Sequence, residues 1–199
     1  MNTIEYLEKH LPPEKAKLVL AYLDFNNCAL RITKPRKTKR GDFRISGKKL
    51  SISINHDINS YRFLFTLVHE IAHLKTHIEK GNRVKPHGLE WKNNFRSLFY
   101  SFKMEEEFAA DESILTAIEK ELLAPKACSG VNLELERAFM AYDDASGTYL
   151  DELAEGQVFI FRGHKYEKLE TRRTRAICLN LGNKRKYTIN KAAIVEVCA

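Results

Sequence analysis

The segment 64-LFTLVHEIAHLKTHI-78 carries most of the information about the fold of this chain. Five of its apolar side chains recur at steps of three and four residues: Leu64, Leu67, Ile71, Leu74 and Ile78. This spacing predicts an amphipathic helix with one core-facing stripe. His69 and His73 fall outside that stripe, so their imidazoles are available for another role.

Within this helix, His69-Glu70-Ile71-Ala72-His73 forms an H-E-x-x-H motif. Residues four apart on a helix lie on one face, about 6 Å apart along the axis. Two imidazoles placed in this way can bind one Zn²⁺ ion at roughly 2.0–2.1 Å. Glu70 can then take a proton from a water on that metal. The alternative is a chance motif on an amphipathic helix, with both histidines merely solvated.

A hydrolytic zinc site needs a third protein ligand, which leaves the fourth position for water. His77 continues the four-residue series, but it lies about 12 Å along the axis from His69, too far for both to reach one ion. His87 is better placed, because glycines and a proline between positions 81 and 88 predict a turn before a second helix. An exposed loop histidine at position 87 is the alternative. Carboxylates downstream also stay open as third ligands: Glu105, Glu106, Glu107 and Asp111.

The motif at 69–73, followed by His87-Gly88-Leu89-Glu90-Trp91, resembles the SprT-like (Spartan-related) family of zinc metalloproteases. The segments Gly41-Asp42-Phe43-Arg44 and Ile52-Ser53-Ile54-Asn55 resemble the strands of that family. The resemblance extends over about residues 1–125. It implies an α+β fold with a minimal zincin-like domain, made of a small antiparallel sheet and the active-site helices. It also implies one Zn²⁺ ion held by His69, His73 and His87, with Glu70 as the catalytic residue of a peptidase.

The cysteines depart from a pattern common in this family. Many SprT-like proteins carry a four-cysteine zinc ribbon, but Cys28, Cys128, Cys178 and Cys198 include no C-x-x-C pair. The C-terminal part instead resembles the β-rich tail of a ribbonless subgroup. Buried free thiols are one interpretation of these cysteines. A second metal site at His164, Cys178 and Cys198 is the other.

Periodicity and turn residues predict the remaining elements. We expect helices over residues 2–10, 12–26, 58–79, 91–102, 105–123 and 133–142, and strands over 29–33, 43–46 and 50–54. From Gly156 the pattern changes to period two, which predicts strands at 158–160, 178–181, 187–189 and 195–197. The expected organisation is a SprT-like domain (1–125), a helical connector (126–153) and a small all-β C-terminal domain with a basic face (154–199).

Composition places limits on the class of protein. The chain has 199 residues, of which 44% are hydrophobic, enough for a packed core. No apolar run approaches the roughly 20 residues of a membrane helix, and residues 1–10 lack the apolar core of a signal peptide. We therefore expect a cytoplasmic protein with reduced thiols and no membrane partner.

The charge distribution is polarised. Residues 31–49 carry nine Lys/Arg against one Asp, and residues 154–199 carry ten Lys/Arg against four Glu. Residues 104–153 carry thirteen acidic side chains against three basic ones. Basic segments favour nucleic acid as a partner, although a solvated lysine-rich hairpin has the same composition. The candidate contacts are Arg36, Lys37, Lys39, Arg40, Arg172, Arg173 and Arg175.

Together these features favour an endopeptidase that acts on DNA-associated or DNA-crosslinked proteins. Two other functions stay open. A metal-dependent nuclease would use the same metal-bound water on a phosphodiester, and a non-catalytic zinc and nucleic-acid-binding module linked to transcription would not need Glu70.

Overall fold

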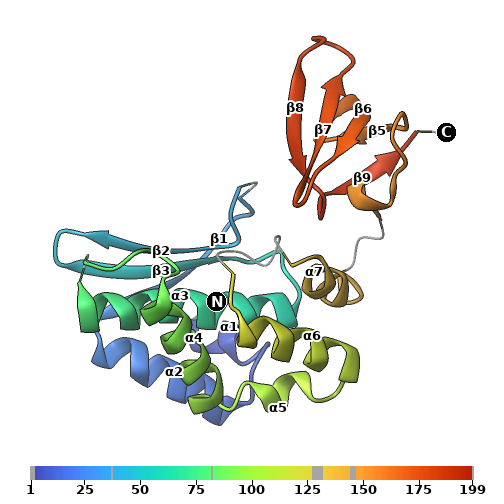
Figure 1. Cartoon of the computed structure of the whole chain (residues 1–199). Coiled ribbons are helices and arrows are strands. Elements are labelled where there is room, and N and C mark those ends of the chain that lie inside the picture. Colours follow the sequence, from blue (N-terminus) through green and yellow to red (C-terminus); the bar gives the residue numbers. More distant parts are fainter. Residues whose placement is uncertain (1–2, 37, 82, 127–131, 144–146, 199) are drawn as a thin grey trace. The chain divides into compact units, whose positions relative to one another are not determined.

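The computed structural model describes residues 3–36, 38–81, 83–126, 132–143 and 147–198. The chain forms two compact units, the first comprising residues 1–127 and 138–142, and the second residues 128–137 and 143–199. The first unit contains helices and a three-stranded sheet, and the second contains a six-stranded antiparallel sheet (Figure 1). The expected α+β class with an all-β C-terminal part is therefore confirmed.

The sheet of the first unit consists of β1 (Cys28–Thr33), β2 (Gly41–Ser46) and β3 (Lys49–Asn55), in the order β1-β3-β2. The strands β2 and β3 form the expected antiparallel hairpin. In contrast, β1 pairs in parallel with β3, so the expectation of an antiparallel sheet was wrong for this strand. The reason is that β2, the next strand along the chain, lies at the far edge of the sheet, and the hairpin then places β3 between β1 and β2.

Seven α-helices occur in the described parts of the chain. They are α1 (Thr3–Leu7), α2 (Pro13–Phe25), α3 (Ser60–Lys80), α4 (Leu89–Ser101), α5 (Glu105–Phe108), α6 (Glu112–Leu123) and α7 (Leu133–Met140). Of these, α2, α3 and α4 lie on the same side of the sheet (Figure 1). The boundary between the two units falls within α7. None of the helices in the described ranges is long and apolar enough to cross a membrane.

The helix α3 carries the core stripe expected from the sequence. Leu64, Leu67, Ile71 and Leu74 are buried, while Ile78 near the end of the helix is exposed. The helix begins after Asn59, whose side-chain oxygen accepts a hydrogen bond from the backbone N–H of Arg62. This N-cap satisfies one of the free donors of the first turn. Gly81 ends the helix with φ 63°, a conformation that favours glycine.

The acidic helix expected over residues 105–123 is interrupted and forms α5 and α6. Asp111 lies between them, and its carboxylate accepts hydrogen bonds from the backbone N–H groups of Ser113 and Ile114. An aspartate that caps a new helix in this way ends the preceding one.

The second unit is built on a meandering antiparallel sheet. Its strands are β4 (Thr148–Tyr149), β5 (Val158–Phe161), β6 (His164–Thr171), β7 (Arg175–Asn180), β8 (Lys186–Asn190) and β9 (Ile194–Val197), in the order β4-β9-β5-β6-β7-β8. A 3₁₀ helix, η2 (Leu150–Glu152), follows β4. The core contains the buried side chains Leu150, Leu153, Phe159, Tyr166, Ala176, Cys178, Ile189 and Val195.

One charged residue is buried beside this core. Lys168 on β6 is 2% exposed. Its ammonium group donates to the carbonyl oxygens of Leu150, Asp151 and Leu153, at 3.0, 3.4 and 2.5 Å. The lysine thereby satisfies carbonyl groups in and directly after η2, and it ties this turn to the sheet.

Candidate metal centre

Three imidazoles from two parts of the first unit converge on one point. His69 and His73 lie on consecutive turns of α3, and His87 lies in the turn before α4. The Nε2 atom of His87 is 3.1 Å from Nε2 of His69 and 2.9 Å from Nε2 of His73. Among the described residues, these three form the only group of three or more His, Cys, Asp or Glu side chains close enough to hold one metal ion.

The backbone of the turn places His87 within reach of α3. His87 has φ 58°, which non-glycine residues adopt infrequently. The next residue, Gly88, packs against the chain before it: a Cβ atom at Gly88 would lie 2.9 Å from the carbonyl oxygen of Lys85. In the sequence His87-Gly88, a histidine with positive φ is followed by a glycine. The lack of a side chain at Gly88 permits the close contact with the backbone of Lys85.

The buried indole ring of Trp91 packs against all three histidines. Its ring centroid lies 4.6 Å from His69, 5.4 Å from His73 and 4.6 Å from His87. The indole Nε1 donates to the backbone carbonyl of His69 at 3.4 Å. Phe95 stacks on the indole with an interplanar angle of 8°, and its ring also lies 6.1 Å from that of His69. The sequence analysis singled out Trp91 as the last residue of the His87–Trp91 motif, and the structure shows that it contacts every member of the group.

The environment keeps the imidazoles neutral. Burial lowers the pKa of His69 well below its ordinary value, and the neighbouring His73 and His87 lower it further. Burial, followed by the nearby His87, lowers the pKa of His73 to about 4, and burial also lowers the pKa of His87. Each side chain can therefore offer a nitrogen lone pair at neutral pH.

This donor set fits a divalent metal ion. The Nε2 atom of His87 has either one proton or one lone pair, so it cannot form well-aligned hydrogen bonds with both neighbours. A cation between the rings would instead use a lone pair from each. Two nitrogens bound to a tetrahedral zinc ion at about 2.0–2.1 Å lie about 3.4 Å apart, and the spacings found here require only a small expansion. The group can thus hold a metal ion with three nitrogen ligands.

Glu70 lies beside this group and is directed toward β2. The side chain is 7% exposed, and its carboxylate accepts a hydrogen bond from the backbone N–H of Phe43. Burial raises the pKa of Glu70 to about 7, although the bond from Phe43 acts in the opposite direction. A carboxyl group with a pKa in this range can both accept and donate a proton near neutral pH.

The position of Phe43 follows from the hydrogen-bond pattern of the hairpin. Residues directly opposite each other in an antiparallel ladder alternate between hydrogen-bonded and non-hydrogen-bonded pairs. Arg40 accepts a hydrogen bond from the backbone N–H of Asn55, so Arg40 and Asn55 are a bonded pair. Alternation then turns the backbone groups of Gly41, Phe43 and Ile45 away from β3, toward the free edge of β2. Glu70 therefore binds the free edge of the sheet.

Sequence comparison identifies this part of the chain. Residues 16–108, which include α3, the turn with His87 and all of α4, match the SprT-like family. These residues belong to the SprT-like family. Comparisons with curated proteins and with solved structures gave no match. SprT-like proteins are typically zinc metalloproteases, and membership indicates a metalloprotease-like function that depends on a metal ion.

Other potential ligands of the SprT-like unit lie outside the histidine group. His77 packs against Phe43, with ring centroids 6.0 Å apart, and its Nδ1 is buried without a hydrogen-bond partner. The downstream carboxylates that stayed open as third ligands are also absent from the group in the described structure. Glu106 and Glu107 pair with Lys15 instead, and Asp111 caps α6.

The second metal site considered at His164, Cys178 and Cys198 does not form in the described structure. All three residues lie in the described ranges, and they do not form a group of ligand atoms close enough for one ion. Cys178 is a buried free thiol in the core of the second unit, and burial raises its pKa to about 11.

The candidate nucleic-acid contacts before β2 already have partners within the protein. The Arg36 guanidinium donates to Asn55 Oδ1 at 2.8 Å and to Ser53 Oγ at 2.9 Å. Lys39 forms an ion pair with Asp42 at 2.8 Å, and Arg40 also has interactions of its own. Lys37 lies outside the described residues.

The candidates of the second unit are more accessible. Arg172, Arg173 and Arg175 are exposed around the turn between β6 and β7. Arg172 pairs with Glu170 at 3.0 Å. Contact of either arginine group with nucleic acid remains a prediction.

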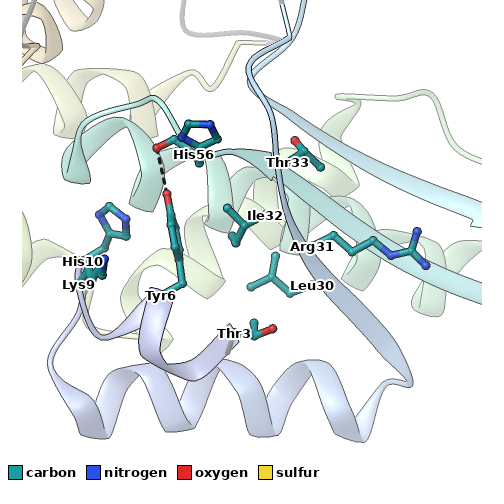
Figure 2. A pocket seen from close by; sticks show the side chains of 9 residues that line it. All are labelled: Thr3, Tyr6, Lys9, His10, Leu30, Arg31, Ile32, Thr33 and His56. Atoms are coloured by element: carbon teal, nitrogen blue, oxygen red, sulfur yellow. Dashed lines mark hydrogen bonds between the residues drawn. The ribbon is translucent and has the colours of Figure 1, made fainter. Parts of the chain in front are cut away.

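A pocket of about 910 Å³ lies at the other edge of the SprT-like sheet (Figure 2). Its lining residues are Thr3, Tyr6, Lys9, His10, Leu30, Arg31, Ile32, Thr33 and His56. The Tyr6 hydroxyl donates to the carbonyl oxygen of His56 at 3.1 Å. The pocket borders β1, whereas Glu70 contacts β2 at the opposite edge. None of the three clustered histidines lines it, so this pocket is separate from the candidate metal centre.

Proposed function

We propose that this protein is a zinc-dependent endopeptidase of the SprT-like type that cleaves proteins bound or crosslinked to DNA. The observation that carries the proposal is the convergence of His69 and His73 on His87, with Nε2 atoms 3.1 and 2.9 Å from its Nε2, next to the buried carboxyl group of Glu70. Membership of residues 16–108 in the SprT-like family supports it.

In this proposal the three histidines hold one Zn²⁺ ion through Nε2. When bound, the ion would supply Lewis acidity, which would lower the pKa of water and polarise a peptide carbonyl group. Glu70 accepts the proton of the attacking water at a carboxylate oxygen and passes it to the leaving amine. Burial raises the pKa of Glu70 above the ordinary value for glutamate, which makes the carboxylate a better proton acceptor.

The free edge of β2 offers a place for the substrate. Backbone groups of Gly41, Phe43 and Ile45 point toward this edge, and Glu70 contacts it. An extended polypeptide can add to such an edge through main-chain hydrogen bonds, which give binding with little preference for particular side chains. Low selectivity of this kind makes control of access important.

Binding to DNA would provide that control by bringing the protease to its substrates. Three exposed arginines of the second unit, at positions 172, 173 and 175, support this part of the proposal. Such side chains neutralise phosphates, and their contribution falls as salt concentration rises.

The test compares the wild-type protein with Glu70→Gln on a protein crosslinked to a DNA oligonucleotide, with and without added single-stranded DNA. We expect the wild type to cleave the crosslinked protein and Glu70→Gln to lose at least 100-fold in rate while keeping its zinc. Retained cleavage by the variant would reject Glu70 as the base.

The same assay distinguishes the two other functions. Cleavage of protein-free DNA or RNA, in place of the attached protein, would indicate a nuclease. Bound zinc with no cleavage of any substrate would indicate a non-catalytic binding module. Both results would contradict the proposed peptidase.

A further inference from the structure

Gly41, the first residue of β2, lies unusually close to the carboxyl group of Glu70. A Cβ atom at this position would lie 2.6 Å from Glu70 Oε1, 2.9 Å from Glu70 Cγ and 2.5 Å from Thr66 Cγ2. Favourable contacts between carbon atoms begin at about 3.5 Å. Any side chain at position 41 would therefore displace one of these groups.

The requirement for glycine here is one of space. Gly41 is not among the residues with positive φ, so its backbone conformation is open to other residues. The atoms in the way differ in how easily they move. The carboxyl end of Glu70 can rotate away, whereas Thr66 Cγ2 belongs to a stiff β-branched side chain.

The backbone that carries Gly41 is fixed by hydrogen bonds from the neighbouring strand. The side-chain amide of Asn55 donates to the carbonyl oxygens of Arg36 and Lys39, at 3.3 and 3.2 Å. Its backbone N–H donates to Arg40 at 2.9 Å. These hydrogen bonds fix the position of the start of β2 relative to α3. The backbone at Gly41 therefore cannot readily shift to accommodate a larger residue.

We infer that Gly41 is a positioning residue for Glu70, because only a residue without a side chain leaves room for the carboxylate to reach the backbone N–H of Phe43 and stay beside the histidine group. The carboxylate is held from two sides: the Gly41 backbone limits it sterically and the Phe43 amide binds it. The catalytic part of this inference rests on the proposed peptidase function, whereas the structural part does not.

The first experiment isolates the contact with Glu70. Gly41→Ala is made in a Thr66→Ser background, because serine removes the Cγ2 atom and leaves Glu70 as the remaining obstacle. Thr66→Ser alone is the matched control and keeps wild-type activity. We expect the double variant to lose at least 10-fold in kcat, with KM within twofold of the control and an unchanged ratio of zinc to protein. Unchanged kcat, or loss of zinc in parallel with activity, would overturn the positioning role.

The second experiment needs no enzymatic activity. The Phe43 amide lies on a free sheet edge, so its protection against hydrogen exchange depends on Glu70. We expect Glu70→Ala to increase the exchange rate of the Phe43 amide at least 10-fold, while the amide of Asp42, which faces β3, changes little. Gly41→Ala should have the same selective effect. An unchanged Phe43 rate in Glu70→Ala would overturn the inference.

The two readouts separate the possible failures. Selective loss of Phe43 protection in a protein that cleaves no substrate would contradict the peptidase proposal and support the structural role of Gly41. Cleavage by the wild type with no response of Phe43 would contradict the positioning role alone.

Discussion

The indole nitrogen of Trp91 donates a hydrogen bond to the backbone carbonyl oxygen of His69 over 3.4 Å, while the two rings lie 4.6 Å apart. This contact joins α4 to the turn of α3 that carries the first histidine. Trp91 is 1% exposed, and Phe95 stacks on its indole ring. The orientation of the candidate metal centre therefore depends on a residue outside the group of three histidines.

We predict that Trp91→Phe keeps the fold but weakens zinc binding by about 10-fold, since groups that orient metal ligands contribute about 10- to 100-fold to affinity. Phenylalanine preserves most of the packing and removes the donor to His69. Competition with a chromogenic zinc chelator measures the change. Trp91→Ala, by comparison, should lower the free energy of unfolding by about 3–5 kcal/mol.

We predict that His87→Ala loses zinc whereas His77→Ala keeps it. His87 has both other imidazoles within 3.1 Å, while His77 is outside the group. Zinc per protein after gel filtration, measured by elemental analysis, should fall from about one to near zero in the first variant only. Equal zinc content in the two variants would contradict the assignment of the third ligand.

Lys168→Met tests the buried ammonium group of the second unit. Methionine is similar in length but leaves the carbonyl groups of Leu150, Asp151 and Leu153 without this donor. Buried acceptors that lose a partner cost about 1–3 kcal/mol, so we expect the free energy of unfolding of this unit to fall by that amount in denaturant titration. A more stable variant would show that desolvation of the charge outweighs its hydrogen bonds.

Lys168 also explains why one strand could not be predicted. The segment that forms β6, His164–Thr171, has apolar residues only at Tyr166 and Leu169. Its buried position 168 is occupied by a lysine. A lysine at a core position breaks the period-two pattern by which β5, β7, β8 and β9 could be anticipated. Its partners are carbonyl groups, which leave no trace in the sequence.

The candidate metal centre was more predictable than its surroundings. The positions of His69, Glu70 and His73 follow from helical spacing, and the turn residues before α4 indicated His87. The role of Gly41 could not be predicted, because a close approach between a backbone and a carboxylate depends on how β2 packs on α3. The parallel pairing of β1 could not be predicted either, since it depends on which position in the sheet the chain reaches after β1.

The stability of the first unit should fall in acid partly because of His10. Burial, with a smaller effect of Lys9, lowers the pKa of this imidazole from 6.5 to about 4, and its Nδ1 contacts Ser60 Oγ at 2.9 Å. The unfolded chain takes up a proton near pH 6.5, and the folded protein does so only near pH 4. Between these values the unfolded state binds more protons, so the free energy of unfolding decreases as the pH falls.

His10→Asn removes this titration and can retain a hydrogen bond to Ser60. We expect the difference in stability between wild type and variant to be constant above about pH 6.5 and to shift in favour of the variant as the pH falls toward 4. Urea titrations at a series of pH values measure it. A difference that does not vary with pH would show that His10 is not responsible.

Arg36 and Arg175 provide a test of where the protein binds nucleic acid. The Arg36 guanidinium donates to Asn55 and Ser53, next to the segment that leads to Gly41, whereas Arg175 is exposed at the start of β7. Because hydrogen bonds of a charged group contribute about 1.5–3 kcal/mol each, we expect Arg36→Gln to lower the free energy of unfolding by roughly 2–3 kcal/mol. Arg175→Gln should leave stability unchanged, weaken binding to single-stranded DNA and reduce the salt dependence of that binding by about one ion. If Arg36→Gln instead weakens DNA binding at unchanged stability, its contacts with Asn55 and Ser53 do not persist in solution, and the guanidinium is available to phosphates.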